Sequence, residues 1–185
     1  MGLFSKPKEE QVVDIFNGKA FDGYKRLLHV YVINNEQCFI RLNSFDALEN
    51  RSLFDAPIIK VIPNGESYFE TFLRAYKEYT GFSYKQVQND KNEVAQPRVF
   101  ADTLKKTLIY ILVIKDTETI DTARLTQVKF VYDWLSISEF VKTISSDKFV
   151  NYGKGYNDFV VLSMCELFNM EDCIKSLKYT SKQGI

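Results

Sequence analysis

The sequence predicts an α/β (α+β) fold, and two strand-like runs around one amphipathic helix are the basis for this prediction. Thr107 to Ile114 is a continuous apolar run, which is typical of a strand buried on both faces. Tyr24 to Ile33 also carries apolar, β-branched and aromatic side chains on both faces. Between these runs, residues 67–81 have the apolar spacing of a helix with one buried face.

The chain has 185 residues, a length that fits one domain. We expect an N-terminal extension over residues 1–22, which contains a short helix from Glu9 to Phe16. A single domain over 23–179 and a frayed tail over 180–185 are expected to follow. Asn43 to Asp55 reads as a polar connection, and the last helix is expected to turn Phe159, Val160, Leu162, Leu167 and Met170 inward. The further elements expected are strands over 37–42, 57–62, 98–101 and 126–132, and helices over 136–144 and 157–170.

Charge and cysteine content narrow the function classes. Lys plus Arg equals Asp plus Glu, 24 each, so we expect no broad binding to nucleic acid and no membrane association. One histidine and three scattered cysteines exclude a structural zinc site, and the odd cysteine count predicts an intracellular, cytoplasmic protein. His29, in the middle of a strand, is interpreted as a packed, hydrogen-bonded residue. Asn, Lys, Ile and Tyr are frequent, whereas glycines and prolines are few, 8 and 4, a composition that suggests an AT-rich genome such as a viral one.

The helix over 67–81 has clear boundary signals. Ser67 and Glu70 form a capping box at its start, and Gly81 suits its end. Glu70, Arg74 and Glu78 step by four along one side, which reads as an exposed ladder of ion pairs. A second capping box, Ser136 with Glu139, begins a later helix. The residues of the first helix expected to face the core are Phe69, Phe72, Leu73, Tyr76 and Thr80.

The segment from residue 60 to 82 resembles the Nudix box, the signature of enzymes that hydrolyse nucleoside diphosphates linked to another moiety. Glu66, Arg74, Glu78 and Gly81 match charged and glycine positions of that motif at its spacing. Residues 132–139 also resemble the strand-to-helix passage late in Nudix domains. The resemblance covers about residues 24–170 and implies a Nudix-like α/β/α sandwich with a mixed central sheet.

Three departures from the motif bear on activity. Lys60 stands where the motif has Gly, Ala75 where it has Glu, and Tyr79 where it has Glu. In the family, carboxylates on the stripe of Ala75, Glu78 and Tyr79 hold divalent cations, and here only Glu78 remains. Mg²⁺ takes about six oxygen ligands, which one glutamate cannot organise. The carboxylates that could supply replacements from outside the helix are Glu93, Asp102, Asp116 and Glu118.

We therefore predict a Nudix-fold pseudoenzyme that binds a nucleotide-like ligand or a protein partner and does not hydrolyse it. The predicted ligand-binding residues are Glu66, Arg74, Glu78 and Tyr79, with Arg74 and Glu78 as remnants of a catalytic site. No cofactor is expected under this prediction. The alternative is a divergent pyrophosphohydrolase of nucleoside diphosphate derivatives, with Glu78 as a ligand of Mg²⁺ or Mn²⁺. An unrelated α/β domain that matches the motif by chance is the third interpretation.

Overall fold

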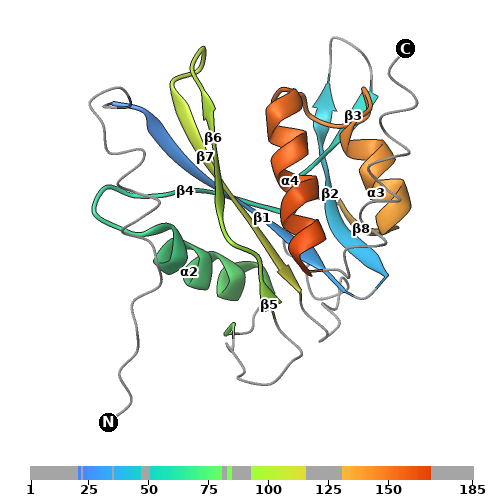
Figure 1. The fold of residues 1–185 in the computed structure, drawn as a ribbon, viewed down its shortest axis with the longest axis horizontal. Helices are drawn as coiled ribbons and strands as arrows, with labels where there is room; N and C mark the ends of the chain where they lie inside the picture. Colours follow the sequence, from blue (N-terminus) through green and yellow to red (C-terminus); the bar gives the residue numbers. More distant parts are fainter. Residues whose placement is uncertain are drawn as a thin grey trace.

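Helices cover both faces of a mixed sheet in the computed structural model, which describes residues 21, 23–34, 36–46, 51–80, 83–84, 93–115 and 131–167 (Figure 1). The predicted α/β/α sandwich is confirmed. Its helices are α2 (Tyr68–Thr80), α3 (Ile137–Ile144) and α4 (Lys154–Leu167). Its strands are β1 (Lys25–Ile33), β2 (Gln37–Asp46), β3 (Arg51–Asp55), β4 (Ile58–Val61), β5 (Glu93–Val94), β6 (Arg98–Asp102), β7 (Thr107–Lys115) and β8 (Val131–Ser136).

The sheet divides into two wings at β1. One edge of β1 pairs in parallel with β7 along its whole length. Its other edge pairs first with β4, from Leu27 to Val30, and then with β2, at Val32 and Ile33. One wing therefore holds β4, β1, β7, β5 and β6, and the other holds β3, β2 and β8. The two wings join through the short β1–β2 ladder.

Alternating side chains build two cores, one on each face of the sheet. Leu28, Val30 and Val32 of β1 point to the core beneath α2, whereas Tyr31 and Ile33 point to the core beneath α3 and α4. The strand β7 alternates in the same way, and every residue from Thr107 to Ile114 is buried. This confirms the predicted central strand, because only a strand covered on both faces keeps a continuous apolar sequence.

The structure corrects several sequence-based predictions. The stretch from Asn43 to Asp55 is not simply a connection, because β2 continues to Asp46 and β3 begins at Arg51 and pairs with it. Backbone pairing stabilises these strands despite their polar side chains. The last predicted strand does not end at Tyr132 but continues to Ser136, paired with β2. Its predicted start at 126–130, and the tail of the last helix with Met170, lie outside the described residues.

Two leucines expected in the core are exposed. Leu73 of α2 is 37% exposed and Leu162 of α4 is 40% exposed, because each lies on the edge of its apolar stripe. Their neighbours Phe72, Tyr76 and Val160 are buried as predicted. The capping box of α3 is confirmed, with Ser136 accepting from the Glu139 backbone while Glu139 reaches back. The predicted N-terminal extension, apart from Phe21, and the frayed tail lie outside the described residues, as does Gly81, and the side chain of Thr80 is not described.

Two further observations bear on the environment of the protein. Within the described residues no helix is long and apolar enough to cross a membrane. Cys38 is a buried free thiol, whereas Cys165 is disulfide-bonded. A disulfide is more typical of oxidising compartments, so it does not support the intracellular location inferred from the cysteine count, which stays a prediction.

Candidate functional site

The loop that enters α2 is held by short-range hydrogen bonds. Gly65 has a φ of 81°, a backbone conformation that favours glycine, and so allows the tight turn before the helix. The Ser67 side chain accepts from the Glu70 backbone at 3.1 Å, and Glu70 accepts from the Ser67 backbone at 2.9 Å. This confirms the predicted capping box and fixes where the helix begins.

Arg74 joins the helix to this loop. Its guanidinium donates to both carboxylate oxygens of Glu66, at 3.3 and 2.9 Å. The backbone carbonyl of Glu66 accepts in turn from Arg26 on β1, at 3.3 Å. The predicted ladder of Glu70, Arg74 and Glu78 is therefore wrong. Glu66 offers Arg74 a planar, two-bonded partner that an i, i+4 neighbour on the helix does not match.

Glu78, the remaining carboxylate of the predicted metal-binding stripe, is paired with Lys60. The Nζ atom of Lys60, on β4, lies 2.7 Å from Oε1 of Glu78. The same ammonium lies over the ring of Tyr79, 5.2 Å from its centroid, in a cation–π contact. Lys60, which stands where the motif has glycine, thus contacts both Glu78 and Tyr79.

Ala75, the third position of the stripe, does not face this cluster. It is fully buried in the core beneath α2, whereas the side chain of Glu78 is 55% exposed. The stripe therefore crosses from the core to the surface. A glutamate at position 75 would need room that the packed core does not provide, so restoring the motif there is expected to destabilise the protein.

The described residues do not fit a divalent metal site. No three His, Cys, Asp or Glu side chains among them gather closely enough to hold an ion. Asp102, a predicted replacement ligand, instead accepts from the backbone of Lys105 at 2.9 Å, in the β6–β7 turn. The side chain of Glu93 is not described, and Asp116 and Glu118 lie outside the described residues.

Aromatic side chains lie both on α2, next to Lys60, and on β2 and β8 of the second wing. We define the aromatic row as Tyr79, Tyr132, Phe39 and Trp134. Phe39 stacks on Tyr132 with centroids 5.1 Å apart, and Trp134 lies 5.0 Å from Phe39. Tyr132 and Trp134 are half-buried, and Phe39 is buried beneath them. Tyr79 and Tyr132 both pack against the core beneath α2. Burial raises the pKa of Tyr132 to about 12, so its hydroxyl stays protonated at neutral pH.

Solved structures share this arrangement of sheet and helices. A protein from Deinococcus radiodurans, 15% identical, matches with a TM-score of 0.50 over 74% of this chain and 80% of that one. An ADP compounds hydrolase, 12% identical, matches with a TM-score of 0.51 over 77% and 71%. A NUDIX hydrolase from Nitrosomonas europaea, 13% identical, matches with a TM-score of 0.48 over 85% and 90%.

The first two of these structures, with TM-scores of 0.50 and 0.51, share the fold of this chain, which is Nudix-like. No protein-family model matches the sequence, and no curated protein matches it. The likeness therefore establishes the fold alone, at identities too low to carry an activity over.

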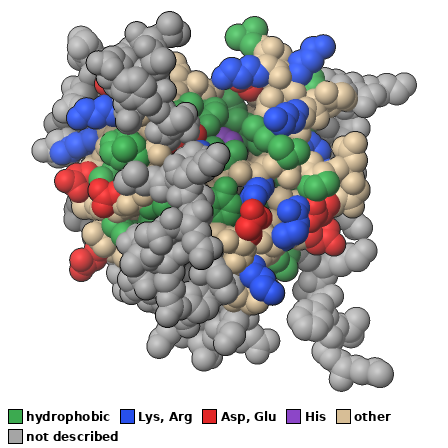
Figure 2. Space-filling model, turned by 180° about the vertical axis from the view of Figure 1, so that it is seen from behind, with side chains coloured by type: hydrophobic (Ala, Val, Ile, Leu, Met, Phe, Trp, Pro, Cys, Tyr) green, Lys and Arg blue, Asp and Glu red, His purple; other side chains and the backbone are tan. Residues whose placement is uncertain are grey.

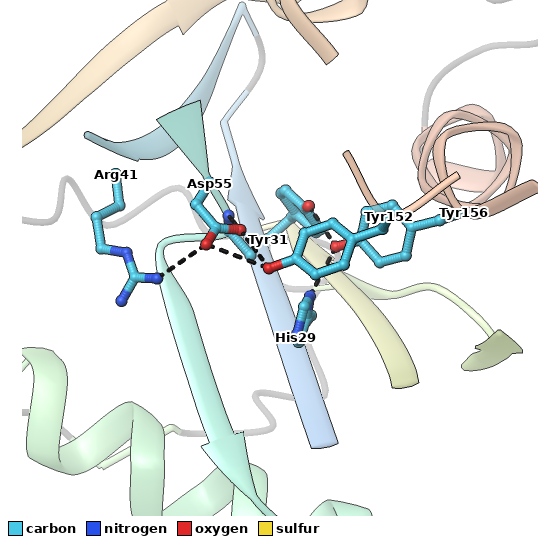
Figure 3. Close-up of polar contacts among 7 residues, drawn as sticks. His29, Tyr31, Arg41, Asp55, Tyr152 and Tyr156 are labelled. Atoms are coloured by element: carbon cyan, nitrogen blue, oxygen red, sulfur yellow. Dashed lines mark hydrogen bonds and ion pairs between the residues drawn. The ribbon is translucent and has the colours of Figure 1, made fainter. Parts of the chain in front are cut away.

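A second polar cluster of the Nudix-like fold is buried and was not predicted. We define the buried network as His29, Tyr31, Arg41, Asp55, Tyr152 and Tyr156 (Figure 3). The Tyr156 hydroxyl lies 2.8 Å from Nδ1 of His29 and 2.6 Å from the Tyr31 hydroxyl. Asp55 accepts from Tyr152 at 3.0 Å and from Arg41 at 3.2 Å. The network connects β1, β2 and β3 with α4 and the segment before it.

Burial dominates the protonation of this network. It lowers the pKa of His29 from 6.5 to about 3, with a smaller contribution from the charge of Arg41. The imidazole is therefore neutral in the folded protein, and its Nε2 atom is buried without a hydrogen-bond partner among the described residues. Burial also raises the pKa of Asp55, although Arg41 and the hydrogen bonds to the carboxylate oppose this shift.

The interpretation of His29 as a packed, hydrogen-bonded residue is confirmed, but its partners could not be read from the sequence. Tyr156 follows His29 by 127 positions, and Tyr152 follows Asp55 by 97. No local periodicity relates residues so far apart. The only available signal was Asp55 itself, a carboxylate directly before an apolar run.

Proposed function

We propose that this protein binds a nucleotide-like ligand at the surface of α2 and the aromatic row, and does not hydrolyse it. The ion pair between Lys60 and Glu78 is the observation that carries the proposal. Phosphoanhydride hydrolysis of this kind uses cations to neutralise phosphate charge and to activate water. Here the remaining carboxylate is already neutralised by an ammonium, which supplies one positive charge and coordinates no water.

The aromatic row supports a planar ligand group. Half-buried aromatic side chains stack with nucleobases, and each stacked base contributes about 1–3 kcal/mol. The Tyr132 hydroxyl itself is buried, without a hydrogen-bond partner in the described part of the chain, so a ligand would meet the ring and not the hydroxyl. Lys60 and Arg74 contact α2 and its entry loop, and under this proposal they are the cations that meet a bound phosphate.

The distribution of surface charge argues against a long nucleic acid as the ligand. Among the described residues coloured in Figure 2, basic and acidic side chains are interspersed, without a continuous basic stripe. The formal net charge is zero. Long polyanions are bound chiefly by clustered lysines and arginines, so a single small molecule or a protein segment agrees better with this surface.

Thermal unfolding with ADP, ATP, ADP-ribose and NADH, each in EDTA and in Mn²⁺, tests the proposal. We expect stabilisation by at least one nucleotide in EDTA and no product by chromatography. Trp134→Leu should weaken that binding by about 1–3 kcal/mol, because it removes the stacking surface. Phe159→Leu is the matched control, since Phe159 is a half-buried aromatic on α4, across the sheet.

Two outcomes would contradict the proposal. Product formation that needs Mn²⁺ and disappears in Glu78→Gln would establish the alternative, a divergent pyrophosphohydrolase. Stabilisation by none of the four nucleotides would remove the nucleotide-like ligand and leave a protein partner as the interpretation to pursue.

A further inference from the structure

We infer that Lys60 is a built-in cation that takes the place of a divalent metal ion at Glu78 and keeps such ions out. The inference rests on the non-hydrolytic part of the proposed function and does not depend on which ligand binds. It follows from the disagreement between the Nudix-like fold, whose family holds metal ions on this helix, and the side chains that this chain places there.

The geometry of Lys60 distinguishes it from an incidental surface lysine. Its backbone is fixed in β4, where Lys60 is the pairing partner of Leu28 in β1. The Lys60 side chain is only 25% exposed, whereas the side chain of Arg74, on α2, is 51% exposed. The ammonium has two partners at once, the Glu78 carboxylate at 2.7 Å and the Tyr79 ring at 5.2 Å.

The partners of this ammonium include both changed and unchanged motif positions. Glu78 is the retained carboxylate, and Tyr79 replaces a glutamate with a ring whose face attracts a cation. Lys60 itself replaces a glycine, so the motif has no side chain where this chain places a charge. In this cluster the Lys60 ammonium contacts both the Glu78 carboxylate and the face of the Tyr79 ring. A divalent ion at Glu78 would have to displace or repel the ammonium.

Mn²⁺ binding to the full chain, measured as loss of the free-ion electron paramagnetic resonance signal, tests this inference. Lys60→Glu replaces the ammonium by a second carboxylate beside Glu78. We expect this variant to bind Mn²⁺ about tenfold more tightly than the unmodified protein. Adding Glu78→Gln to it should abolish the gain. Lys77→Glu is the matched control, because it makes the same charge change on exposed α2 but points away from its neighbour Glu78.

A milder variant keeps the test valid if Lys60→Glu does not fold. Lys60→Gln removes the ammonium and adds no like charge, and we expect a small gain in Mn²⁺ affinity that Lys60→Arg does not show. The inference is overturned if the unmodified protein binds Mn²⁺ at Glu78 as tightly as Lys60→Glu does. It is also overturned if neither Lys60 variant exceeds its control.

These outcomes are separate from those of the nucleotide experiment. Nucleotide binding is measured in EDTA, whereas this test uses the metal alone. A gain of Mn²⁺ affinity in Lys60→Glu without nucleotide binding would retain the inference and reject the nucleotide-like ligand. Nucleotide binding without a gain of Mn²⁺ affinity would retain the nucleotide-like ligand and reject the inference about Lys60.

Discussion

Two groups of polar side chains, the surface cluster of Lys60, Glu66, Arg74 and Glu78 and the buried network, have opposite surroundings. In the first, Glu66 and Glu78 are paired with Arg74 and Lys60 at the surface, where water screens the charges. In the second, the pair of Arg41 and Asp55 is almost fully buried, with side chains 7% and 3% exposed. From this difference we expect that the surface cluster is replaceable in the fold, whereas the buried network contributes strongly to its stability.

The largest expected effect comes from breaking the buried pair. Arg41→Met removes the guanidinium that is paired with the buried Asp55 carboxylate and should lower the free energy of unfolding by about 3–5 kcal/mol. Arg74→Met breaks a better aligned pair, but Glu66 stays hydrated and stability should change little. Urea denaturation of both variants measures the difference. Equal losses would mean that exposure does not separate the two clusters.

The next effect is a loss of stability in acid. His29 has a pKa of about 3 in the folded protein and about 6.5 when unfolded, so the unfolded chain binds more protons between these values. Stability should therefore fall as the pH drops below about 6.5, by about 2–3 kcal/mol at pH 4.5. Asp55, whose pKa is raised, takes up its proton more readily when folded and reduces the loss at the lowest pH.

His29→Asn isolates this contribution. Asparagine does not titrate and keeps a polar atom near the position of Nδ1, so the stability of the variant should depend less on pH between 6.5 and 4.5. Urea denaturation at several pH values provides the comparison. An equally steep loss in the variant would assign the acid sensitivity to other groups.

A smaller effect is expected from the hydroxyl that joins two members of the network. Tyr156→Phe keeps the ring but leaves the His29 and Tyr31 polar atoms without this partner, which should lower the free energy of unfolding by about 1–3 kcal/mol. Tyr79→Phe serves as the surface control, because it keeps the ring beneath the Lys60 ammonium. Thermal unfolding compares the two. A change at Tyr79 as large as that at Tyr156 would contradict the division of roles.

The sequence predicted those parts of the molecule that depend on neighbouring residues. The strand β7 was visible as an apolar run, and both capping boxes were visible as serine and glutamate three positions apart. These signals are local because the apolar pattern of a strand and the cap of a helix each involve a short stretch of chain.

Contacts between distant residues could not be predicted in this way. The partner of Glu78 was misplaced on its own helix, whereas Lys60 comes from a strand 18 positions earlier. The motif comparison did mark Lys60 as unusual, but charge alone did not indicate where its side chain would go. The buried network gave no pattern, since its members come from four elements and a loop.

The short ladder between β1 and β2 contains a cysteine whose reactivity can report on the junction of the two wings. Cys38 is one of its residues, paired with Ile33, and its sulfur is a free thiol sealed from solvent. Burial raises the pKa of this thiol, which keeps it in the unreactive protonated form. Its rate of alkylation should therefore report openings that expose Cys38, including separation of β1 from β2, and a ligand that bridges both wings should slow that reaction.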